Sequence, residues 1–258
     1  RLFSDRVGLI AAAFLAVFPG AVEVSQYNKP DPLLTLMAAL SVLVTLVYLE
    51  KGGRWLAFTS GIAFGLTVAS KYNGALVILP FVLAVILRHR GRFLAKPDLY
   101  LGAAGSIAGF TAGCPYFIVE LPRFFNHVAD GLYTYGHSGR EGAEGVHNWY
   151  AHFGYTVNYG AGWLAVLAAL SGLALVLYRL NPSLAVFVLF PVLYYSFYGA
   201  QRIKFPGNLI PVYPFLAVLA ALAVHEGTAR LSGWLQSRQR LRRVPWQPAL
   251  LSVALVAV

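Results

Sequence analysis

Charged side chains that could handle a phosphorylated substrate stand at the ends of apolar runs in this sequence. Lys71 lies in ASKYNG, Arg202 and Lys204 lie in YGAQRIKFPGN, and Asp31 lies in SQYNKPD. Arginine can bind two phosphate oxygens at once, and lysine acts as a point charge. A carboxylate beside them can act as a base, orient an acceptor hydroxyl or bind a cation. We therefore expect a phosphate-binding site made of the three cations, with Asp31 as the catalytic acidic residue beside it.

Simpler interpretations of these residues stay open at this point. The cations can reach headgroup depth with their stems along lipid, and Asp31, between Pro30 and Pro32, can cap the helix that begins there. Glu23 is a second catalytic candidate, because a carboxylate at membrane depth is costly unless it faces a cavity or a partner. The residues expected to contact the substrate are Tyr27, Asn28, Tyr72, Asn73, His137 and Glu141.

The segment 119–159 carries a polar stretch that reads YGHSGREGAEGVHNWY. His137, Glu141, Glu144 and His147 in this stretch are residue types that bind zinc and similar ions. Four glycines interrupt the stretch, so helical spacing gives no reason to group these residues. A polar loop that closes over a bound substrate is favoured over a metal site, and a plain connector is the third interpretation. No metal or cofactor is assigned, and the sequence leaves open whether a divalent metal takes part.

The elements that must position these residues are membrane helices. Of the 258 residues, 58% are apolar and 12% are charged, and the mean hydropathy is +0.64. Apolar runs of about 20 residues recur, each long enough to cross about 30 Å of hydrocarbon. Backbone polar groups in lipid must be satisfied within their own segment, so each run should be a helix. The sequence predicts an all-α, polytopic transmembrane helical bundle with a long outer loop at 119–159.

Eight complete spans are expected, with a truncated ninth that begins near residue 248. The eight are 7–24, 32–49, 54–69, 73–88, 99–118, 160–178, 184–200 and 209–225.

Lysine and arginine are unevenly divided between the two sets of connections. Fourteen of the 20 lie at the start of the chain and in 50–54, 88–98, 179–183 and 226–247. The positive-inside bias places these connections in the cytoplasm, so 119–159 and the candidate site should face outward. We expect an integral protein of a prokaryotic inner (plasma) membrane, with an active site on the outer side.

Several classes of function are disfavoured by composition and motifs. The net charge of +10 suits contacts with membrane lipids rather than nucleic acid. Cys114 is the single cysteine, which excludes disulfides and cysteine-based metal sites within the chain. There is no P-loop, no GxSxG and no dinucleotide fingerprint. Because the chain begins at Arg1 without a methionine, we expect residues 1–258 to be a fragment that forms one transmembrane domain and lacks preceding spans.

Four stretches carry a family resemblance: SQYNKPDPLLTLMAALSV, GRWLAFTSGIAFGLTVASKYNGALVILP, YGHSGREG and RIKFPGNLIPVYPFLAVLAALA. Together they resemble glycosyltransferase family 39, the protein-mannosyltransferase and aminoarabinose-transferase-like group of type C membrane glycosyltransferases. The resemblance extends over essentially the whole chain.

This resemblance implies an enzyme, a membrane glycosyltransferase. It would move a sugar from a polyprenyl-phosphate donor to an acceptor lipid, glycan or protein on the periplasmic or extracellular side. In this resemblance Asp31 matches the acidic residue that opens the helix at the family's "kPD" mark. Lys71 matches the basic residue that ends the mark "GL…A.K". Arg202 with Lys204 occupies the basic position before the "P.YPFLA" span. The family's best-known catalytic acid lies in the first outer loop, which we expect upstream of Arg1. The 258 residues alone are then expected to be inactive.

The expected chemistry is an inverting displacement at the anomeric carbon, with the cations stabilising charge on the departing phosphate. The alternative function is a transporter or flippase for a lipid-linked or anionic substrate, and a non-catalytic membrane subunit is a third. Transport is disfavoured because the sequence shows no paired half-repeats and almost no charge in the middle of its spans. The sequence identifies neither the sugar nor the acceptor, nor the oligomeric state.

Overall fold

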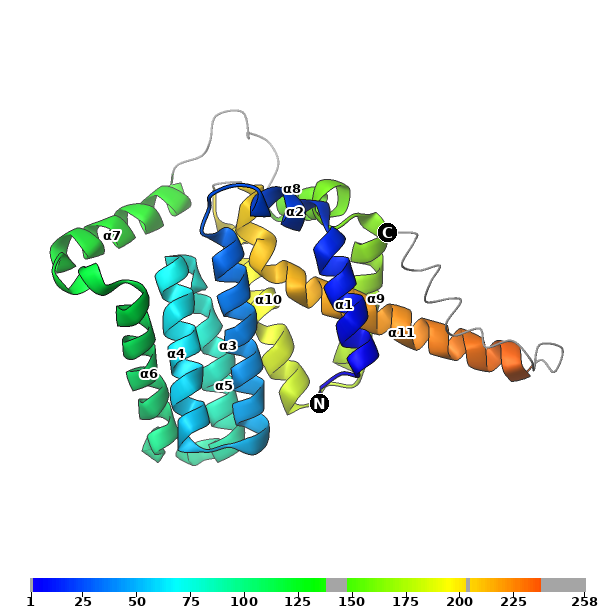
Figure 1. The fold of residues 1–258 in the computed structure, drawn as a ribbon, viewed down its shortest axis with the longest axis horizontal. Helices are drawn as coiled ribbons and strands as arrows, with labels where there is room; N and C mark the ends of the chain where they lie inside the picture. Colours follow the sequence, from blue (N-terminus) through cyan, green and yellow to red (C-terminus); the bar gives the residue numbers. More distant parts are fainter. Residues whose placement is uncertain (1, 138–147, 203–204, 238–258) are drawn as a thin grey trace. The chain divides into compact units, whose positions relative to one another are not determined.

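The structure is a computed structural model that describes residues 2–137, 148–202 and 205–237. Throughout these residues the secondary structure is helical, with eleven α-helices joined by short 3₁₀ segments and one π-helical segment (Figure 1). The all-α class predicted from the apolar runs is therefore confirmed for the described part of the chain.

The α-helices are α1 (Asp5–Val17), α2 (Pro19–Ser25), α3 (Asp31–Lys51), α4 (Arg54–Ser70), α5 (Ile78–His89), α6 (Pro97–Gly113), α7 (Leu121–His137), α8 (Asn148–Tyr155), α9 (Trp163–Tyr178), α10 (Pro182–Ala200) and α11 (Tyr213–Ser237). The shorter segments are η1 (Tyr72–Val77), η2 (Arg90–Ala95), η3 (Pro115–Ile118), the π-helical η4 (Thr156–Gly160) and η5 (Pro206–Val212).

Each of the eight expected spans coincides with helix, but fewer of them are long and apolar enough to cross a membrane. Within the described residues, four helical segments meet that condition, at Asp31–Lys51, Tyr72–Ala95, Pro182–Ala200 and Gly207–Leu235. Two bent helix pairs raise the number to at most six. The eight predicted segments are thus confirmed as helical, but a count of eight complete membrane spans is not. The ninth span lies outside the described residues.

The chain divides into two compact units. One unit consists of 1–23, 156–180 and 213–258, and the other of 24–155 and 181–212. The second unit contains α3 to α8, α10 and η5, and therefore most of the residues singled out above.

In the second unit, α3, α4, α5 and α6 run alongside one another (Figure 1). The pair α4 and α6 approaches most closely because glycines line both sides of the contact. A Cβ added to Gly65 would lie 2.6 Å from the backbone nitrogen of Phe110, whereas real Cβ contacts essentially never fall below 3.0 Å. Gly61, Gly105 and Gly109 are similarly blocked by backbone atoms of the facing helix. Small residues that let helix backbones approach are typical of packing in membranes.

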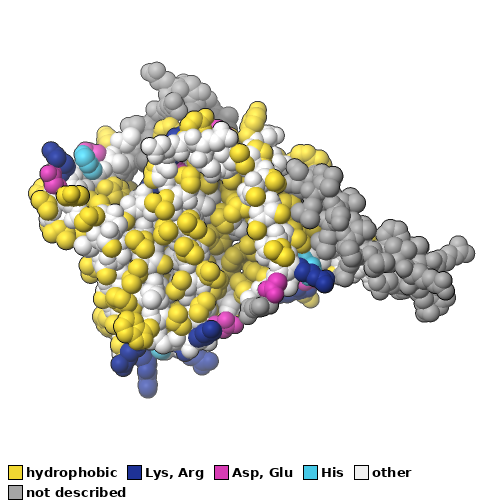
Figure 2. Space-filling model, in the orientation of Figure 1, with side chains coloured by type: hydrophobic (Ala, Val, Ile, Leu, Met, Phe, Trp, Pro, Cys, Tyr) yellow, Lys and Arg dark blue, Asp and Glu magenta, His cyan; other side chains and the backbone are white. Residues whose placement is uncertain are grey.

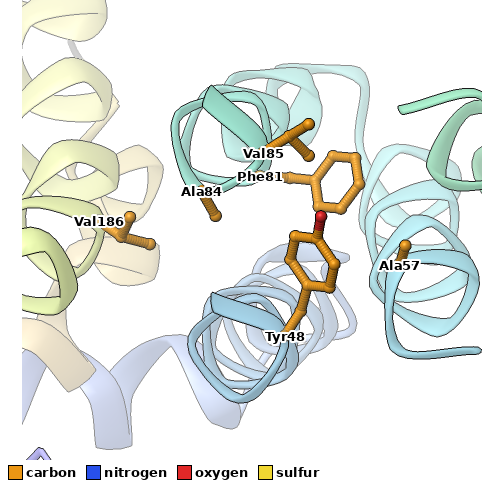
Figure 3. Packing of buried hydrophobic residues seen from close by; sticks show 6 residues of the cluster. All are labelled: Tyr48, Ala57, Phe81, Ala84, Val85 and Val186. Carbon is orange, nitrogen blue, oxygen red and sulfur yellow. The ribbon is translucent and has the colours of Figure 1, made fainter. Parts of the chain in front are cut away.

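A hydrophobic cluster joins α3, α4, α5 and α10 within this unit (Figure 3). The rings of Tyr48 and Phe81 lie 5.7 Å apart between centroids. Ala57, Ala84 and Val186 are fully buried around them. The small alanine side chains leave room for the two rings.

The surface of the second unit is apolar along its helices and charged at their ends (Figure 2). Leu33, Leu36, Leu40 and Leu43 on α3 are exposed between 38% and 55%. In a soluble protein such a band of leucines would be unusual, whereas lipid covers it at no cost. The band is consistent with α3 as a membrane span.

The segment 119–159, expected as a loop, contains α7 and α8 in its described part. The helix α7 lies across the direction of α6 (Figure 1). It is fixed by an aromatic cluster in which Phe124 contacts Phe110, Phe117 and Tyr72 at centroid distances of 5.5–5.7 Å. The helix α7 was not predicted, because the glycines between 136 and 145 suggested an irregular chain throughout the segment.

The first unit is built from α1, α9 and α11, with α11 packed against both of the others. Gly172 of α9 faces the backbone of Leu219 of α11 so closely that no Cβ would fit. Phe18 packs edge-on against Tyr213, with centroids 6.0 Å apart. Close backbone approach and ring packing thus hold this unit together as well.

Candidate functional site

An ion pair between α3 and the end of α4 forms the centre of the candidate site. The Nζ atom of Lys71 lies 2.8 Å from Oδ1 of Asp31. The Asp31 side chain is 7% exposed and the Lys71 side chain is 22% exposed. The carboxylate is therefore buried, while the ammonium keeps one accessible side.

The local helix ends explain why these two residues meet. Asp31 is the first residue of α3 and Lys71 follows the last residue of α4. The turn between the helices uses Gly52 and Gly53, both with positive φ, a conformation that glycine adopts without steric cost. The turn brings α4 back along α3, so the N-terminus of α3 meets the C-terminus of α4. An anion at the first end and a cation at the second are both favoured by the helix dipoles.

The carboxylate of Asp31 does not cap its own helix. Pro30 is the residue before α3, and no side-chain hydrogen bond caps this N-terminus. The simple capping interpretation of Asp31 is therefore wrong, and its carboxylate instead contacts Lys71. Lys29, two residues before Asp31, lies over the Tyr27 ring with Nζ 5.0 Å from the centroid.

A third residue, Asn208 of η5, completes the cluster. Lys71 Nζ donates to Asn208 Oδ1 at 3.2 Å, and Asn208 is 2% exposed. An ammonium group has no acceptor, so the amide must turn its oxygen toward Lys71. The Nδ2 atom of Asn208 is buried without a hydrogen-bond partner among the described residues. Asn208 was missed as a site residue, although a lone amide between Pro-Gly and an apolar run is a visible signal.

The next contact along η1 attaches the site to α10. Asn73 donates a hydrogen bond to the hydroxyl of Tyr198, which is fully buried. Gly74 makes the close approach of η1 possible, since a Cβ there would lie 2.8 Å from both Leu34 Cδ1 and the carbonyl oxygen of Thr67. Tyr198 lies inside an apolar run, so its contact with the site could not be seen in the sequence.

The other predicted residues within the described ranges are exposed at the surface. Arg202 is exposed, and Lys204 lies outside the described residues. Tyr27 and Asn28 are exposed in the turn before α3. Tyr72 is 41% exposed and packs edge-on against the aromatic cluster of α7.

Three further predicted residues lie elsewhere. Glu23 is exposed near the end of α2 and belongs to the first unit. His137 ends α7, where its ring stacks on Tyr133 and its Nδ1 lies 3.1 Å from the Tyr133 carbonyl oxygen. Glu141 falls outside the described residues.

The metal interpretation of 119–159 receives no support from the described residues. Within 2–137, 148–202 and 205–237, no group of three or more His, Cys, Asp or Glu side chains comes together as a metal site. Glu141, Glu144 and His147 lie outside these ranges.

A second buried carboxylate lies at the other end of α3. Asp98 is the aspartate of a second KPD stretch and is 7% exposed. Its Oδ2 accepts from the Tyr48 hydroxyl at 2.8 Å and lies 2.9 Å from Nε2 of His89. Burial acts to raise the pKa of Asp98, but the hydrogen bonds with His89 and Tyr48 outweigh burial and hold the pKa below its ordinary value. This cluster ties α3, α5 and α6 together and was not predicted.

Fold and site together define a class: a helical membrane protein with a partly exposed lysine, ion-paired to a buried carboxylate, at one end of its helices. Residues 1–114 match the sequence model of a family described as dolichyl-phosphate-mannose-protein mannosyltransferase. The predicted resemblance to the protein-mannosyltransferase group is confirmed over this part of the chain, which includes Asp31 and Lys71. The family implies a glycosyltransferase with a lipid-phosphate sugar donor. Neither the curated proteins nor the solved structures gave a match.

Proposed function

We propose that this protein is a membrane glycosyltransferase that moves a sugar from a polyprenyl-phosphate donor to an acceptor on the outer side of the membrane. The observation that carries the proposal is the Lys71 ammonium, which is held by Asp31 and Asn208 and remains 22% exposed. It lies within the residues that match the mannosyltransferase family. The acceptor is a lipid, a glycan or a protein.

The chemistry of Lys71 suits the phosphate of such a donor. An ammonium group has three N–H donors, of which Asp31 and Asn208 engage two. The third can donate to a phosphate oxygen from the exposed side. Charge-assisted hydrogen bonds of this kind are roughly twice as strong as neutral ones. Arg202 and Lys204 are proposed to supply further positive charge to the same phosphate.

The distribution of charge supports an outward-facing site. Lys51 and Arg54 are exposed at the end of α3 opposite Asp31, as are Arg88, Arg90 and Arg92. The 21 residues of α3 separate its two ends by about 30 Å, close to the thickness of the hydrocarbon core. The positive-inside bias assigns the basic end to the cytoplasm, so the Lys71 end faces outward.

The proposed reaction is an inverting displacement. The acceptor hydroxyl loses its proton to a carboxylate and its oxygen forms a bond to the anomeric carbon. The bond from that carbon to the phosphate oxygen breaks, and the electron pair leaves with the polyprenyl phosphate. Lys71 stabilises the charge that grows on the leaving phosphate, which is the kind of electrostatic contribution that often dominates catalysis.

Native mass spectrometry of the intact membrane protein with added polyprenyl phosphate tests the proposal. Lys71→Ala should weaken binding by about 10- to 100-fold, the loss expected for one hydrogen bond to a charged group. Lys51→Ala is the matched control, because it removes an exposed lysine from the opposite end of α3, and its affinity should equal that of the wild type.

Two comparisons decide the outcome. Competition with inorganic phosphate separates recognition of a lipid-linked phosphate from recognition of phosphate alone. Equal affinity of Lys71→Ala and wild type for polyprenyl phosphate would contradict the proposal. Transfer of a sugar from a lipid-phosphate donor, measured in vesicles, then distinguishes a transferase from a flippase, which would move the lipid across the bilayer without breaking the glycosidic bond.

A further inference from the structure

The Lys71 ammonium is held from two sides by groups of different charge, a carboxylate and an amide. We infer that Asp31 and Asn208 are positioning residues that together aim the remaining N–H of Lys71 at the donor phosphate, and that Asp31 is not the base of the reaction. The inference rests on the proposed function. It assigns a role to Asn208 and replaces the catalytic role expected for Asp31.

The two acceptors come from separate elements of the same unit. Asp31 begins α3 and Asn208 lies in η5, which packs against α3. Their contacts with Nζ are 2.8 and 3.2 Å long. Because the three N–H bonds of an ammonium group point tetrahedrally, fixing two of them fixes the direction of the third. Lys71 is therefore held in one orientation rather than left to rotate on its flexible stem.

The burial of Asp31 argues against a role as a base. A base must reach the hydroxyl of an acceptor within hydrogen-bond distance, yet the Asp31 side chain is 7% exposed and engaged with Lys71. Uptake of a proton by Asp31 would also break the ion pair just as charge grows on the phosphate beside Lys71. Removing one partner of a buried pair is strongly unfavourable. A carboxylate that must stay charged to hold Lys71 is poorly suited to accept a proton.

The amide of Asn208 is suited to hold Lys71 without changing the charge of the cluster. Lys71 and Asp31 form a neutral pair, and Asn208 adds an acceptor with no charge. An aspartate at position 208 would give two carboxylates around one ammonium and a net charge of −1 at the site. An anionic phosphate would then be repelled, although the contact with Lys71 itself would persist.

A reciprocal exchange of the two acceptors tests the inference. Asp31→Asn leaves Lys71 with two amides, Asn208→Asp gives it two carboxylates, and the double variant restores one of each on exchanged sides. Polyprenyl-phosphate binding and sugar transfer are measured in the intact membrane protein, together with its thermal stability. Asp98→Asn is the control, because it makes the same change in the second KPD stretch, at the far end of α3.

We expect each single variant to lose about 10- to 100-fold in transfer, the size of a lost charge-assisted contact. For Asn208→Asp this loss should be seen equally in polyprenyl-phosphate binding. The double variant should recover to within about tenfold of the wild type, because the charge and both contacts are restored. Asp98→Asn should bind polyprenyl phosphate as the wild type does.

Three results would overturn the inference. A double variant that is as stable as the wild type but no more active than Asp31→Asn would show that the carboxylate is needed at position 31, as for a base. Wild-type donor affinity in Asn208→Asp would show that the charge at position 208 is irrelevant, and this result counts even if the double variant fails to fold. If Lys71→Ala itself binds the donor normally, the proposed function falls, and the inference falls with it.

Discussion

The close packing of α4 against α6 leads to a prediction about Gly65. A Cβ at this position would lie 2.6 Å from the backbone nitrogen of Phe110 and still nearer to the carbonyl oxygen of Ser106. Both obstacles are backbone atoms, so no side chain can rotate away and the two helices must move apart. Gly65→Ala should therefore destabilise the protein.

The size of the effect follows from two opposing contributions. Overpacking a close contact costs about 1–3 kcal/mol, and replacing glycine by alanine within a helix returns up to about 1 kcal/mol. Because both obstacles are backbone atoms, the cost lies in the upper part of that range, about 2–3 kcal/mol, and with a return of about 1 kcal/mol the net loss is about 1–2 kcal/mol. At roughly 2–4 °C per kcal/mol for a chain of this size, the Tm should fall by about 2–8 °C. The assay is thermal unfolding in detergent at one fixed scan rate, because membrane proteins often unfold irreversibly.

Gly131→Ala provides the matched control. Gly131 lies within α7, and a Cβ there would meet nothing within 4 Å. Only the gain in helix propensity applies, so the Tm should be unchanged or should rise by up to about 4 °C. A Gly65→Ala variant that is as stable as Gly131→Ala would refute the close approach of α4 and α6.

Two further predictions concern charged groups. Because the pKa of Asp98 is lower in the folded state, its carboxylate stabilises the fold above its unfolded pKa of about 3.9. That contribution is lost as the pH falls below about 3.9 and through the folded pKa, and Asp98→Asn should remove this dependence from a series of Tm values measured from about pH 5 down to about pH 2. Arg179 forms two hydrogen bonds with Glu226, at 2.9 and 3.1 Å, but the pair lies at the surface. Arg179→Ala should leave Tm nearly unchanged, and a large loss that persists in high salt would contradict the surface position of the pair.

The sequence predicted the helices better than it predicted the site. A long apolar run in lipid must be helical, because its backbone polar groups have no other hydrogen-bond partners. Each of the eight expected spans accordingly coincides with helix. Glycines and polar residues in 119–159 hid α7 and α8, since an amphipathic surface helix has no long apolar run. The number of true spans also depends on bends and helix ends, which hydropathy does not report.

Within the site, Asp31 and Lys71 could be singled out because charge beside an apolar run is costly and therefore conspicuous. Their 2.8 Å contact could not be read from the chain, because Asp31 was equally suited to cap α3. Asn208 and Tyr198 were not chosen as site residues, because an uncharged polar side chain beside an apolar run is less conspicuous than a charged one.

By itself the sequence determined that the chain is a helical membrane protein with more positive charge in one set of its connections, because hydropathy and charge act on each segment separately. Residues 1–114 also match the sequence model of the mannosyltransferase family. Only the tertiary structure decided which polar residues share a site. Hydrogen bonds and ion pairs require atoms about 3 Å apart, and Lys71 meets Asp31 and Asn208 only because the turn at Gly52 and the packing of η5 bring three distant segments together.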